Sequence, residues 1–132
     1  RQELVQEYVR GLAGCAAYRV VQQRSGSCSY YKCIVLLNGI DREFLREFSK
    51  QRGISFTGEV YHRGVHSMQV FSDAAQKATA DSQPKKMPDT EAACANHACP
   101  PLYPELSTQD VQRICAVMLE AAKSFESRGG TC

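Results

Sequence analysis

Residues 30–41 read YYKCIVLLNGID, and this stretch decides how the rest of the chain is arranged. Its first part, residues 30–37, is a nearly continuous apolar run, which is typical of a strand covered on both faces near the centre of a sheet. The Asn-Gly pair and Asp41 then end the strand and cap a helix. The stretch therefore predicts a strand-to-helix unit in the middle of an α/β fold.

Helical and extended patterns lie on both sides of this unit. Residues 1–14 are predicted to form an amphipathic helix and residues 17–21 a short strand. The helix that follows the central strand spans residues 41–52 and ends at Gly53. Residues 54–57 alternate between apolar and polar side chains, so a further strand is expected there.

The last helix has the clearest local signals in the chain. Ser107 stands at its N-cap, Asp110 completes a shortened capping box, and Leu106 can pack against Val111. Its apolar stripe is assigned to core packing and consists of Val111, Ile114, Cys115, Met118, Leu119, Ala122 and Phe125.

The stretch before that helix is irregular. Residues 72–89 contain Met87 as their only large apolar side chain, so we expect a flexible surface loop there. The alanines of residues 90–97 favour a short helix, and three prolines within residues 100–104 then force an extended passage.

Composition places limits on function. The 132 residues, 43% hydrophobic and 23% charged, suit one domain over residues 1–132 with a modest core. The net charge of +2 is too small to predict a nucleic-acid or anionic-membrane partner. Since neither a membrane span nor a signal peptide is visible, a cytoplasmic location is expected. The start at Arg1 leads us to expect a piece of a longer chain or a processed product.

Seven cysteines raise the question of cross-links or metal. Their odd number, without a secretory signal, favours a reduced chain. A small zinc module is the alternative, because Cys28 and Cys33 bracket four residues, as do Cys94 and Cys99, with His97 between. Paired zinc ligands usually lie on tight turns called knuckles. The sequence around neither cysteine pair predicts such a turn, so we expect no metal site.

Polar chemistry is concentrated in residues 59–66, which contain two of the three histidines together with a tyrosine, an arginine and a glutamate. Histidines near a strand end are more often surface or structural residues than ligands. The order of the surrounding elements is what favours a functional interpretation.

That order resembles a known family. Its elements resemble, in the same order, those of the C-terminal small domain of the DegT/DnrJ/StrS aminotransferases. These elements are the strand of residues 30–37, the helix with Arg42 and Leu45, residues 58–61, the Val65-His66 pair and the PLYPELS run of residues 101–107. The resemblance covers about residues 3–125 and implies a pyridoxal-phosphate enzyme. Such enzymes commonly move an amino group from glutamate or glutamine to a keto sugar, often nucleotide-linked, or to a cyclitol.

The resemblance also implies a fold and partners. The fold is the α/β (α+β) small domain of the aspartate aminotransferase type, with a short, mostly antiparallel sheet and helices packed on one face. The cofactor lysine, the phosphate-binding groups and the aspartate on the pyridine nitrogen belong to a large domain, in the same or a separate polypeptide. We therefore expect no catalytic or cofactor-binding residue and no bound pyridoxal phosphate in this chain alone, and a homodimer in the full enzyme.

Two residues match the family's substrate side. Tyr61 and His66 correspond to the aromatic residue and the histidine of the loop that closes over the active site, so both are expected to bind substrate. The family commonly continues with Leu-Gln-Pro, whereas this chain has Ser67-Met68-Gln69. A stand-alone, non-enzymatic binding or regulatory module built on the same domain is the alternative function, and dehydration in place of transamination is a further possibility within the family.

Overall fold

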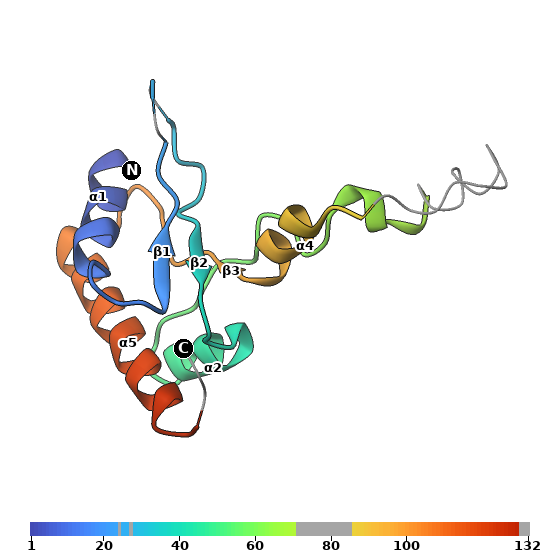
Figure 1. The fold of residues 1–132 in the computed structure, drawn as a ribbon. Helices are drawn as coiled ribbons and strands as arrows, with labels where there is room; N and C mark the ends of the chain where they lie inside the picture. Colours follow the sequence, from blue (N-terminus) through green and yellow to red (C-terminus); the bar gives the residue numbers. More distant parts are fainter. Residues whose placement is uncertain (24, 27, 71–85, 130–132) are drawn as a thin grey trace, which may run out of the picture.

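The computed structural model describes residues 1–23, 25–26, 28–70 and 86–129. Within them, four α-helices accompany a three-stranded antiparallel sheet (Figure 1), which confirms the predicted fold class. The strands are β1 (Tyr18–Val20), β2 (Val35–Leu37) and β3 (His97–Ala98), in the order β1-β2-β3. The helices are α1 (Gln2–Gly11), α2 (Arg42–Lys50), α4 (Pro88–Ala95) and α5 (Thr108–Glu126), and a short 3₁₀ helix, η1, spans Val65–Ser67.

Cross-strand pairing separates the sheet into two different faces. Tyr18 is paired with Leu37, and Val35 with Ala98, and all four side chains are buried on the core face. The opposite face carries Arg19, Leu36 and His97 in one row. Figure 1 shows α1 and α5 on the core side of the sheet and α4 on the other side.

The core is closed by long-range hydrogen bonds from two buried tyrosines. The Tyr8 hydroxyl donates to the carbonyl of Pro101 at 2.8 Å, and the Tyr18 hydroxyl donates to the carbonyl of Met118, also at 2.8 Å. Burial raises the pKa of Tyr8, so its hydroxyl stays a donor. These bonds fix α1 and β1 against the C-terminal part of the chain.

The strand predictions were too long. Only residues 35–37 of the predicted 30–37 strand are in β2, and Tyr30 has φ 47°, a left-handed conformation that an extended strand does not contain. The 54–57 strand is wrong as well, since its one ladder contact is a bridge between Thr57 and Cys99. The predicted 17–21 strand is confirmed in its central residues as β1.

Helix boundaries were predicted more closely. Asp41 caps α2 by accepting from the Phe44 amide at 2.7 Å, and Gly53 follows that helix with φ +74°. Ser107 and Asp110 form the expected capping box of α5. The first helix ends at Gly11, three residues before the predicted end.

The irregular region differs from the prediction where it is described. The last two residues of the predicted 72–89 loop belong to α4, which begins at Pro88 because proline suits the first turn of a helix. Residues 72–85 lie outside the described part of the chain. None of the described helices is long and apolar enough to cross a membrane.

Candidate functional site

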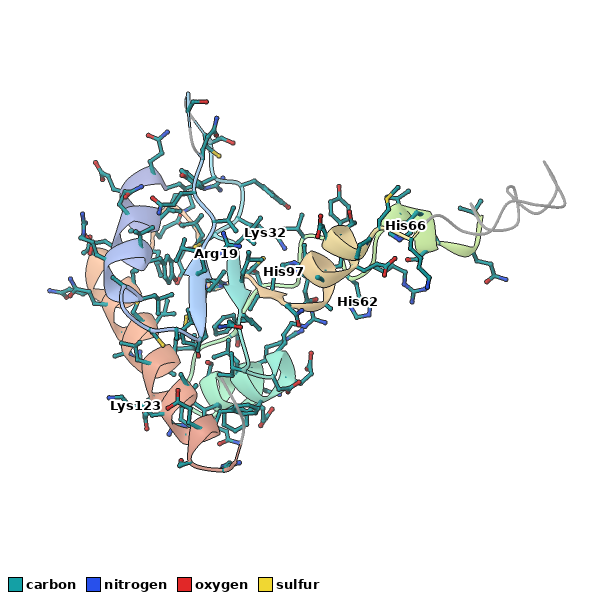
Figure 2. All side chains as sticks on the ribbon, in the orientation of Figure 1. Arg19, Lys32, His62, His66, His97 and Lys123 are labelled. Carbon is teal, nitrogen blue, oxygen red and sulfur yellow. The ribbon has the colours of Figure 1, made fainter. Side chains whose placement is uncertain are left out.

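Tyr61 and His66 lie on a projection from the sheet. We call this projection the arm, and it consists of residues 58–70 and α4, which extend together away from β3 (Figure 1). Figure 2 shows His97 where the arm meets the sheet, and His62 and His66 further out. The arm is therefore attached at the face of the sheet that α1 and α5 leave uncovered.

Two hollows flank the arm. The sheet hollow, of about 510 Å³, lies between the uncovered face of the sheet and α4, and its walls include Leu36, Val60 and Ala93. The arm hollow, of about 530 Å³, is bounded by η1 and the start of α4. Tyr61 lines both hollows and is 61% exposed. Since His66 also lines the arm hollow, the structure brings the two predicted substrate residues to one cavity.

His66 is held in place by α4. Its Nε2 lies 3.0 Å from Oε1 of Glu91, whose other partner is the amide of Met87 at 3.2 Å. These hydrogen bonds, the one from His66 first, lower the pKa of Glu91 below its ordinary value. An ionised carboxylate only accepts hydrogen bonds, so Nε2 of His66 carries the proton, and Nδ1 of the neutral ring is an acceptor.

Gly64 is required for this position of His66. A Cβ at residue 64 would lie 2.5 Å from Cε1 of His66 and 2.7 Å from its Nδ1. The backbone of Gly64 has φ −66°, which any residue can adopt. The glycine is therefore needed for the close approach of the imidazole ring and not for a turn.

His97 is a site residue that sequence reasoning placed only in a zinc motif. It is 5% exposed, its Nε2 accepts from the amide of Val60 at 3.1 Å, and its Nδ1 lies 2.7 Å from the carbonyl of Ala93. Both ring nitrogens are thus used within the chain. No sequence signal marked this role, because Val60 is 37 residues away.

The residues of the zinc alternative, Cys28, Cys33, Cys94, Cys99 and His97, all lie in the described part of the chain. Over residues 1–23, 25–26, 28–70 and 86–129, no group of three or more His, Cys, Asp or Glu side chains is placed to hold a metal ion. Burial raises the pKa of Cys33 to about 12 and also raises that of Cys99. Both sulfurs are therefore neutral thiols in the core.

Glu59 anchors the base of the arm. Its carboxylate lies 3.0 Å from Nη1 of Arg46 and 3.7 Å from Nε of Arg42, and its side chain is 14% exposed. The pKa of Glu59 is lowered, most strongly by a hydrogen bond from its own backbone amide and then by the charges of the two arginines and His97. Glu59 is therefore ionised at neutral pH and ties the arm to α2.

The family follows from comparison with known sequences. A profile of the DegT/DnrJ/EryC1/StrS aminotransferase family matches residues 1–119. The chain belongs to this family. No protein of curated function matches the sequence significantly.

Several solved structures share the fold of this chain. The aminotransferase TlmJ from Streptoalloteichus hindustanus superposes with a TM-score of 0.75 at 19% identity, over 94% of this chain and 31% of TlmJ. DesI, solved with its TDP-sugar product, gives a TM-score of 0.77 at 19% identity, over 97% of this chain and 32% of DesI. DesV from S. venezuelae, solved with a ketimine intermediate, gives 0.73 at 22% identity, over 92% of this chain and 31% of DesV. This DegT-family chain thus spans about a third of the length of the chains in these structures.

The covalent anchor of pyridoxal phosphate is a lysine that faces the cofactor. None of the described lysines lines the sheet hollow or the arm hollow. Nζ of Lys32 donates to the carbonyls of Gly58 and Glu59, and Lys123 lies on α5, far from His66 (Figure 2). The side chains of Tyr61 and His66, which do line the arm hollow, carry hydrogen-bonding groups.

Proposed function

We propose that this chain is the small domain of a sugar-type aminotransferase, formed by residues 1–132, and that it contributes Tyr61 and His66 to the binding of a keto-sugar substrate. Membership of the DegT/DnrJ/EryC1/StrS family supports the reaction class. The observation that carries the assignment of the two residues is that both line one hollow, although they come from different parts of the arm.

The two side chains offer complementary chemistry. The Tyr61 phenol is both a donor and an acceptor, and Nδ1 of His66 is an acceptor because Nε2 faces Glu91. Sugar hydroxyls need both kinds of partner, and the diphosphate of a nucleotide-linked sugar accepts from the phenol. DesI, with its TDP-sugar product, supports a nucleotide-linked substrate for this chain as well. Neither residue is proposed to transfer the proton in the reaction.

A large domain is proposed as the partner, in the same or a separate polypeptide. The relatives' chains are about three times as long as the region that matches this one. The surface beside the hollows is also apolar, since Val21, Val60 and Val65 are 38%, 37% and 51% exposed. Grouped apolar side chains on one face indicate an interaction surface.

The cofactor chemistry belongs to that partner. Pyridoxal phosphate, when bound there, supplies the electron sink for the amino-group transfer. The chain alone is proposed to bind no cofactor, and the assembled enzyme to act as a cytoplasmic homodimer. Tyr61 and His66 would then face the substrate from the side opposite the cofactor.

The test compares histidine variants in the enzyme assembled with its large domain. His66→Ala is expected to raise the KM for a nucleotide-linked keto sugar by about tenfold, the effect of losing one good hydrogen bond, with an unchanged spectrum of bound cofactor. His62→Ala is the matched control, because His62 is exposed and lines neither hollow. Equal KM values for the two variants, with a lower melting temperature for His66→Ala alone, would show a structural role for His66. A folded chain that never combines with a large domain would favour the binding-module alternative.

A further inference from the structure

The backbone that leads to Tyr61 is held in an unusual way. Thr57 donates its amide to the carbonyl of Cys99 at 3.0 Å. Beyond it, residues 58–63 make no backbone-to-backbone hydrogen bond among those found in the described part of the chain. Side chains instead provide the hydrogen bonds that hold this backbone. Lys32 donates to the carbonyls of Gly58 and Glu59, and His97 accepts from the amide of Val60.

The chemistry of His97 is fixed by its partners. The Val60 amide is a donor, so Nε2 must accept, and the proton of the neutral ring lies on Nδ1. Nδ1 then donates to the carbonyl of Ala93, the expected partner for a donor. The buried imidazole of His97, a residue of β3, thus links two parts of the arm. It connects the peptide next to Tyr61 with α4.

A second connection holds the same segment against α2. Arg42 donates through Nη1 to the carbonyl of Cys94 at 3.0 Å and lies near the carbonyl of His97 at 3.5 Å. It also faces the Glu59 carboxylate. The guanidinium group of Arg42 therefore contacts both Glu59, the residue before Val60, and the backbone near His97.

Cys99 is the rival partner for the Val60 amide. Its buried sulfur lies close enough to that amide for the amide to lower the pKa of the thiol, although burial raises it more. A neutral thiol is a weak acceptor, and imidazole nitrogen is a strong one. His97 is therefore the partner expected to determine the position of the peptide.

We propose that His97 is a positioning residue for Tyr61: its Nε2 holds the Val60 amide and so keeps the Tyr61 side chain at the shared wall of the two hollows. The part of this inference that concerns substrate rests on the proposed function. The hydrogen-bonding part concerns this chain alone and is tested separately.

Two amide side chains separate the two roles of the ring. In His97→Gln the longer side chain carries an oxygen to the place of Nε2 and keeps an acceptor for Val60. In His97→Asn the side chain keeps a donor for the Ala93 carbonyl and loses the acceptor. Both are neutral, so charge is unchanged. Cys99→Ala removes the rival acceptor.

Amide hydrogen exchange measured by NMR on this chain gives the first result. His97→Asn is expected to raise the exchange rate of Val60 about tenfold, while His97→Gln and Cys99→Ala leave it within twofold. The amide of Leu45, which donates to the carbonyl of Asp41 in the first turn of α2, reports general destabilisation, and its exchange rate is expected to stay unchanged. Equal effects of Gln and Asn, an equal rise at Leu45, or a rise in Cys99→Ala would overturn the proposal.

Nitrogen NMR of the parent chain supplies a signature that packing alone does not produce. Nε2 of His97 is expected at the chemical shift of an unprotonated ring nitrogen and Nδ1 at that of a protonated one, and the reverse assignment would refute the geometry.

In the assembled enzyme, His97→Asn should raise the KM for the keto sugar several-fold with unchanged kcat, and His97→Gln should restore it. If Tyr61→Phe raises KM and His97→Asn does not, the positioning role is wrong. If Tyr61→Phe has no effect, the proposed substrate contact fails, and the exchange result on His97 still decides the hydrogen bond.

Discussion

Gly11 of α1 packs closely against Cys115 of α5, and this contact leads to a quantitative prediction. A Cβ added to residue 11 would lie 2.6 Å from Sγ and 2.9 Å from Cβ of Cys115. Non-bonded heavy atoms are most stable at about 3.5–4.0 Å, so the helices must separate by about 1 Å. Gly11→Ala is therefore expected to strain the core.

Two effects of this substitution oppose each other. Overpacking a core costs typically about 1–3 kcal/mol. Alanine favours a helix over glycine by at most about 1 kcal/mol, and less at the last residue of a helix, which Gly11 is. Steric strain wins, and the free energy of unfolding should fall by about 1–2 kcal/mol. Cys115 is 3% exposed in the middle of its helix, so its side chain has little room to move away.

Urea denaturation of four proteins tests this reasoning: the parent, the two single variants and Gly11→Ala/Cys115→Ala. Cys115→Ala removes the closest atom and should make the double variant more stable than the sum of the single effects by about 1 kcal/mol, with unchanged m values. Gly58→Ala is the control, because a Cβ there meets nothing within 4 Å, and its effect should stay within about 0.5 kcal/mol. A Gly11→Ala variant as stable as the parent, or strictly additive effects, would refute the close-contact argument.

Three other predictions follow from local geometry. Gly64→Ala should push the His66 ring off Glu91, which NMR would detect as a changed chemical shift of Nε2 of His66, whereas an unchanged shift would show that the Nε2–Glu91 hydrogen bond survives the substitution. Ser107→Ala should destabilise α5 by about 1 kcal/mol in thermal unfolding. Hydrogen bonds from Ser107 lower the pKa of Asp110, so the part of the cap that uses this carboxylate should be complete above the ordinary aspartate pKa and be lost as pH falls through the lowered value, while the bond from the Asp110 amide to the Ser107 hydroxyl remains; a pH-independent difference would contradict this. Alkylation at pH 8 followed by mass spectrometry should modify Cys94 before Cys33, whose pKa burial raises to about 12, and the reverse order would disprove that Cys33 is closed to solvent.

Sequence predicted helix ends better than strands for a physical reason. An N-cap acts over three residues, so Asp41 and Ser107 carry their own signal. A ladder depends on distant partners. Val35 is paired with Val20 on one side and with Ala98 on the other, and the left-handed Tyr30 ends the extended run that its apolar neighbours predict. No local pattern contains that information.

The candidate site shows the same division. Family resemblance led to Tyr61 and His66, and the structure places both at one hollow. The family resemblance did not lead to His97 or Glu59. Their roles depend on Val60 and on Arg42, and only the fold brings these partners close. In the sequence, His97 between Cys94 and Cys99 resembles part of a metal motif, whereas in the fold both of its ring nitrogens form hydrogen bonds within the chain.

The two faces of the sheet separate stability from binding. The core face is completed within the chain, since Val35, Tyr8 and Met118 are fully buried between the sheet, α1 and α5. The opposite face is completed only in part, by an arm that polar side chains hold in place and that itself carries exposed valines. Such bonds fix a direction without requiring a second core, so the arm can be both well placed and open to solvent. Substitutions on the core face should therefore change unfolding, and substitutions at the base of the arm should change what the hollows bind.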